Sequence, residues 1–67
     1  MKRSFTLAGH RTSVALEEAF WAALNRLATA RGQTLSALVA TTDAARASDE
    51  PLASALRVLA LLESSRD

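Results

Sequence analysis

The chain has 67 residues and a formal net charge of +1, with no cysteine and a single histidine. A chain of this length forms at most one small domain and buries only about 60% of the surface that its unfolded form exposes, so its stability as a monomer is marginal. The composition excludes a disulfide framework and a structural zinc site, which leaves a partner chain as the remaining source of stability.

The first nine residues are interpreted as a basic arm. Residues 1–16 contain Lys2, Arg3 and Arg11 and no acid, whereas residues 17–67 contain five basic and seven acidic groups. Two such segments brought together in a dimer would place about six positive charges on one face, which favours a polyanionic partner. No apolar signal-peptide region follows Lys2-Arg3, so a cytoplasmic location is expected.

Residues 10–16 alternate as a half-buried strand does, with Thr12, Val14 and Leu16 on one side and Arg11, Ser13 and Ala15 on the other. A lone strand has backbone groups without partners, and two-fold pairing with a second copy would complete a two-stranded antiparallel ribbon. Phe5 and Leu7 also alternate, but in a register that breaks around Ala8-Gly9. The alternative is therefore a hairpin that turns at Gly9-His10 within one chain.

Three helices are predicted after the strand. Residues 17–31 have apolar side chains at helical spacing and end before Gly32, and Thr34 is a suitable N-cap for a helix over 35–47. Pro51 suits the first turn of a third helix over 51–64, whose apolar residues cover most of its circumference, so this helix is expected to pack on several sides. Its apolar stretch is too short to span a bilayer.

The chain resembles the ribbon-helix-helix DNA-binding family, which includes repressors and antitoxins. The resemblance rests on the strand Arg11–Leu16, on Phe20-Trp21 with Leu24, and on the linker 32–36 before Leu38-Val39. A wider similarity, from residues 7–14 through 52–58, resembles a bacterial subfamily with a third helix. The resemblance implies one domain over 1–67 of mainly α class with one short β-strand. It also implies an intertwined homodimer, whose ribbon is shared between two chains and reads duplex DNA.

The resemblance assigns base reading to the outward residues Arg11, Ser13 and Ala15. Arginine can contact guanine O6 and N7 in a bidentate manner and serine can donate or accept a hydrogen bond, while alanine can only touch a thymine methyl group. In this family the start of the second helix anchors DNA phosphate, which here means the turn 34–36. Further phosphate contacts are expected from Lys2, Arg3 and His10.

The remaining candidate residues are expected in the core and dimer interface. They are Thr12, Val14, Leu16, Phe20, Trp21, Leu24, Leu27, Leu38 and Val39, and the phosphate-anchoring turn consists of Thr34, Leu35 and Ser36. Arg57, alone on an apolar helix, is expected either to pair with Asp43 or Glu63 or to mark an exposed stripe.

The sequence thus predicts a homodimeric transcriptional regulator, such as a repressor, with no enzymatic activity, no metal and no cofactor. The third helix would enlarge the dimer core or recruit another dimer. The alternative is a protein-interaction module, an antitoxin-like adaptor dimer whose third helix binds a protein such as a toxin, with weak or no DNA binding. No membrane partner is expected.

Overall fold

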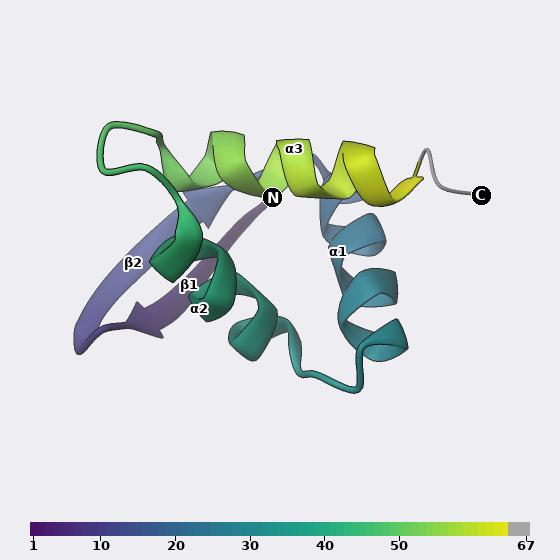
Figure 1. Cartoon of the computed structure of the whole chain (residues 1–67), viewed down its shortest axis with the longest axis horizontal. Helices are drawn as coiled ribbons and strands as arrows, with labels where there is room; N and C mark the ends of the chain where they lie inside the picture. Colours follow the sequence, from purple (N-terminus) through teal and green to yellow (C-terminus); the bar gives the residue numbers. More distant parts are fainter. Residues whose placement is uncertain (65–67) are drawn as a thin grey trace.

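The computed structural model describes residues 1–64 and consists of one β-hairpin followed by three helices (Figure 1). The elements are β1 (Lys2–Leu7), β2 (His10–Ala15), α1 (Glu18–Ala30), α2 (Leu35–Ala45) and α3 (Leu52–Ser64). Helix α2 contacts β1, α3 contacts β2, and α1 packs against both other helices. The turn of the hairpin therefore lies on the side of the molecule opposite α1 (Figure 1), whereas the start of α1 meets the open end of the hairpin through Trp21.

The second strand of the ribbon comes from the same chain. β1 and β2 are antiparallel, with Arg3 opposite Val14 and Phe5 opposite Thr12. The interpretation of residues 1–9 as an arm is therefore corrected, because six of them form β1. Within one chain β2 pairs along one edge with β1, as the hairpin alternative proposed, and a ribbon shared between two chains is not shown.

A two-residue turn joins the strands. Ala8 has φ 51° and Gly9 has φ 82°, and the flanking Leu7 and His10 are paired. Positive φ at both central residues is the pattern of a type I′ turn, whose twist matches that of the flanking strands. Glycine adopts this conformation without cost, but alanine is strained in it because its Cβ crowds the backbone.

The inner face of the hairpin completes a core shared with the helices. Phe5, Leu7, Val14 and Leu16 are buried, while their neighbours along each strand face solvent. The helices contribute Trp21, Leu24, Leu27, Ala28, Leu38, Val39, Leu52, Leu56 and Ala60 to the same cluster. Alternation along both strands thus produces one apolar and one polar face.

Trp21 links the start of the chain to α1. Its Nε1 donates a hydrogen bond to the carbonyl of Met1 at 2.7 Å, and that carbonyl also accepts one from the Leu16 amide at 3.1 Å. The Trp21 ring packs against Phe5 with ring centroids 5.8 Å apart, and the Arg3 guanidinium lies 5.4 Å from its centroid. Arg3 therefore belongs to the helix-facing side of the ribbon.

The helix ends follow from their capping residues. The Thr34 side chain accepts a hydrogen bond from the Ala37 amide at 3.0 Å, which is the expected N-cap of α2. Gly32, with φ 68°, follows α1 and directs the chain toward α2. The observed bounds lie within two residues of those expected from the sequence.

Helix α3 packs on one face within the chain. Leu52, Leu56 and Ala60 are buried, but Val58, Leu61 and Leu62 are exposed. Although apolar residues surround most of α3, a single chain buries only one side of this helix.

Arg57 ties α3 to the start of α1. Its Nε donates to Glu17 at 3.1 Å, and its guanidinium lies 5.8 Å from the Phe20 ring centroid. A hydrogen bond from the Glu17 backbone, followed by the one from Arg57, holds the pKa of the Glu17 carboxyl below its usual value. The partner of Arg57 is thus neither of the two carboxylates expected, since Asp43 pairs with Arg46 and Glu63 with Arg31.

Relief of strain at the turn gives a first prediction. Ala8→Asn should raise the free energy of unfolding by about 0.5–1 kcal/mol, because asparagine tolerates positive φ and Asn-Gly is a preferred type I′ pair. Urea denaturation followed by the fluorescence of Trp21 would measure the change. Ala8→Val, which places a β-branched residue at the same φ, should destabilise the fold, and an equal stability of the two variants would contradict the role given to this turn.

Candidate functional site

The outer face of the hairpin is a small polar surface without acidic side chains. Six exposed residues form it in three cross-strand pairs, Lys2 with Ala15, Ser4 with Ser13, and Thr6 with Arg11. The side chains predicted to face outward from residues 10–16 are thus on this face, and β1 adds an equal number. We call these six residues the ribbon face.

The two cations of the ribbon face lie at opposite corners. Lys2 and Arg11 are on different strands and four residue pairs apart, which is about 14 Å along the ribbon. Between them the hydroxyls of Ser4 and Ser13 lie 3.1 Å apart, close enough for a hydrogen bond across the strands. The centre of the face therefore presents hydroxyl donors and acceptors, with a positive charge on each side of them.

The residues predicted to contact phosphate are not gathered in one place. Lys2 is on the ribbon face and His10 is exposed beside the turn, whereas Arg3 is half-buried on the other side of the ribbon against Trp21. The loop that leads into α2 and the turn of the hairpin lie on opposite sides of Figure 1. One anion site cannot therefore include both the turn of the hairpin and the start of α2.

The start of α2 offers backbone donors. The Thr34 side chain caps the amide of Ala37, while the amides of Leu35 and Ser36 have no acceptor within the helix because they belong to its first turn. Thr34 and Ser36 are exposed and Leu35 is half-buried. The turn is geometrically suited to an anion, as the sequence suggested.

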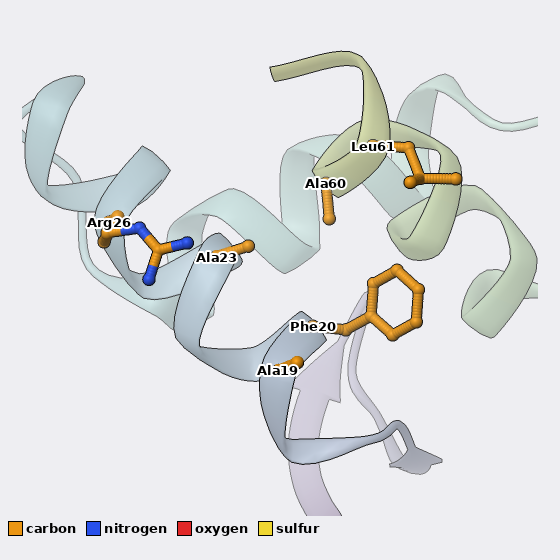
Figure 2. A pocket seen from close by; sticks show the side chains of 6 residues that line it. All are labelled: Ala19, Phe20, Ala23, Arg26, Ala60 and Leu61. Carbon is orange, nitrogen blue, oxygen red and sulfur yellow. The ribbon is translucent and has the colours of Figure 1, made fainter. Parts of the chain in front are cut away.

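Most residues predicted for the core are buried within a single chain. Val14, Leu16, Trp21, Leu24, Leu27, Leu38 and Val39 are buried, and Thr12 and Phe20 are half-buried. Their burial in one subunit means that none of these seven needs a second chain to be covered. The half-buried Phe20 stands apart, because it lines a hollow between α1 and α3 (Figure 2).

The residues that the sequence reasoning missed are Ser4 and Thr6. Both are on β1, in the segment interpreted as an arm, and both face outward because Phe5 and Leu7 face inward. The alternation of Phe5 and Leu7 was the signal that could have identified them.

Two further observations limit the kinds of site that residues 1–64 contain. No three histidine, cysteine, aspartate or glutamate side chains of this range are grouped so that they could hold a metal ion. Across the same range, none of the helices has both the length and the apolar character that crossing a membrane requires.

Comparison with protein families identifies the family of the chain. A family model described as a ribbon-helix-helix domain matches residues 1–64, a range that includes the hairpin and all three helices. Among curated proteins and solved structures, none matches the chain.

Proposed function

Because the chain belongs to the ribbon-helix-helix domain family, we propose that it is a DNA-binding regulator whose ribbon face enters the major groove of duplex DNA. Members of this family are typically transcription regulators or antitoxins that bind DNA as dimers. The observation that carries the proposal is the ribbon face itself, a two-stranded surface with hydroxyls, two cations and no acid. A two-stranded ribbon of this kind fits the major groove.

The ribbon face has the chemistry for reading bases. Arg11 can donate two parallel hydrogen bonds to guanine, and Ser4 and Ser13 can donate to or accept from the edge of any base. Ala15 offers only a methyl contact to thymine, so the reading is weaker on the side of the ribbon where Ala15 faces Lys2. The proposed readers are therefore Arg11, Ser13 and Ser4, with Thr6 beside Arg11.

Phosphate contacts would orient the ribbon in the groove. Lys2 and His10 lie at the two ends of the hairpin, where the flanking backbones of the groove would pass. The start of α2, at Thr34, Leu35 and Ser36, would bind a phosphate through its free amides at a second position on the duplex. Arg3 is left out of this set because it stacks on Trp21.

We propose further that the protein acts in the cytoplasm as a homodimeric transcriptional repressor of the kind found in bacteria. A dimer doubles the number of ribbons, and two-fold symmetry would match a palindromic operator. The fold alone does not require the second copy, because each chain completes its own ribbon.

A second candidate function is a protein-interaction module of the antitoxin-like kind, in which α3 binds a partner such as a toxin and DNA binding is weak. The exposed side chains of Val58, Leu61 and Leu62 favour it, since such apolar residues are unusual on a surface that contacts only water. The two functions differ in their dependence on salt.

Salt dependence separates the candidates. Affinity for a mixed-sequence duplex, measured by fluorescence anisotropy between 50 and 300 mM salt (about a sixfold range), should fall linearly on logarithmic axes with a slope of about −0.9 for each phosphate neutralised. Two to six contacts, roughly what one or two ribbons provide, would give a slope between about −2 and −5. A slope near zero would exclude the DNA-binding function and leave the interaction module.

Arg11 gives a residue-level prediction. Arg11→Ala should weaken binding to a selected operator by about 1–3 kcal/mol, because a bidentate guanine contact is lost. Arg11→Lys keeps the charge and should retain affinity for mixed-sequence DNA while losing preference for the operator.

Arg31→Ala is the control for the loss of one positive charge, because Arg31 pairs with Glu63 away from the ribbon face. Its affinity should match the unaltered protein. If Arg11→Ala bound the operator as tightly as the control, Arg11 would not be a reader.

A further inference from the structure

We propose that the hollow between α1 and α3 binds a small aromatic carboxylate, with the acid group on Arg26 and the ring against Phe20. This site is separate from the ribbon face, and it stands whether or not the ribbon binds DNA. Three observations support it: the size of the hollow, the apolar character of its walls, and an unused positive charge at one end.

The hollow has a volume of about 250 Å³ and lies where α1 passes the C-terminal part of α3 (Figure 2). Cavities for drug-sized molecules usually measure about 300–1,000 Å³. The hollow is therefore suited to a smaller molecule, with one ring and not several. Its lining consists of four residues of α1 and two of α3, which are Ala19, Phe20, Ala23, Arg26, Ala60 and Leu61.

Small side chains create the hollow. Ala19 and Ala23 are about one helical turn apart on α1, and Ala60 lines the same space from α3. Because their side chains end at Cβ, the two helices leave a space that larger residues would fill. Phe20 adds an aromatic wall, and the guanidinium of Arg57 lies 5.8 Å from the centroid of its ring and restrains it. The apolar walls are therefore in place before any molecule binds.

Arg26 supplies the one charge of the lining. Figure 2 shows it at the end of the hollow away from Phe20, with Ala23 between them. Arg26 is exposed, and the ion pairs formed within residues 1–64 do not include it. No acidic residue lines the hollow. The guanidinium is thus available to a carboxylate, which arginine can bind through two parallel hydrogen bonds.

This combination favours an aromatic acid over other small molecules. Phe20 and Arg26 are about 9 Å apart along the helix axis, a span that one ring with an acid group can bridge. Inorganic phosphate would need more donors than Arg26 offers, because the amides beside it are used within the helix. A cation would be repelled by Arg26, and a neutral molecule would gain nothing from its charge.

Titration of the full chain with benzoate, followed by proton–nitrogen correlation NMR, tests the site. Benzoate should give saturable shifts centred on the amides of residues 19–26 and 60–61. Its dissociation constant should be about 0.1–10 mM, in the range that a ligand of roughly ten non-hydrogen atoms reaches. Benzamide, which has the same ring without the charge, should bind about tenfold more weakly. A titration without saturation, shifts centred elsewhere, or equal affinities for the two compounds would overturn the proposal.

Removal of the charge has a matched control on the same helix. Arg26→Gln should weaken benzoate binding about tenfold and leave benzamide binding unchanged, because the bidentate contact to the carboxylate is lost. Arg31→Gln removes the same charge at a residue that pairs with Glu63 and does not line the hollow, so its benzoate affinity should match the unaltered protein. Equal affinities of the two variants for benzoate would refute the role of Arg26.

Filling the hollow gives an independent test with a neighbouring control. Ala23→Leu should abolish benzoate binding because the added side chain occupies the space, whereas Ala22→Leu, at an exposed residue outside the lining, should bind as before. Circular dichroism would verify that both variants are folded. Binding that survives Ala23→Leu, or that Ala22→Leu removes equally, would refute the site. The salt slope of the unaltered protein decides DNA binding separately, so failure of one proposal leaves the other standing.

Discussion

Antiparallel pairing of β1 with β2 inside one chain is the interaction on which the rest of the structure depends. It pairs one edge of each strand and, because side chains alternate, it divides the side chains into an apolar face and a polar face. The apolar face, with Phe5 and Val14, joins the helices in one core. The polar face is left as a ribbon that needs no second subunit to exist.

This pairing depends in turn on a locally unfavourable turn. Ala8 adopts positive φ although it is not glycine, and the strain persists because the register of two six-residue strands and the burial of Phe5 and Leu7 determine the turn. Trp21 adds a second restraint at the other end of the hairpin through the Met1 carbonyl. The ribbon is therefore held at both ends by the same chain.

The sequence predicted which way side chains face better than it predicted which strands and side chains pair. A period of two placed Arg11 and Ser13 outward and Val14 inward, and helical spacing with Gly32 and Thr34 located the helices, because these patterns are local. Which strand pairs with β2 is a long-range choice, and alternation fixes the face of a residue without identifying the neighbouring strand. The same limit explains Arg3, which the charge pattern assigned to DNA phosphate.

Arg57 illustrates the limit for side-chain partners. The sequence suggested Asp43 or Glu63, which are both nearer to Arg57 along the chain than Glu17, its actual partner. Packing of α3 across the start of α1 brings residues 40 positions apart into contact. Only the tertiary structure determines that choice.

The proposed DNA binding by the ribbon face and the proposed homodimer support each other energetically. One ribbon face carries only two formal charges, Lys2 and Arg11, and two phosphate contacts supply little affinity at physiological salt. A homodimer would carry two such ribbons, so binding of the first ribbon would raise the effective concentration of the second at the same duplex. The low charge of a single ribbon is therefore an argument for association of two chains, and not an argument against recognition of DNA.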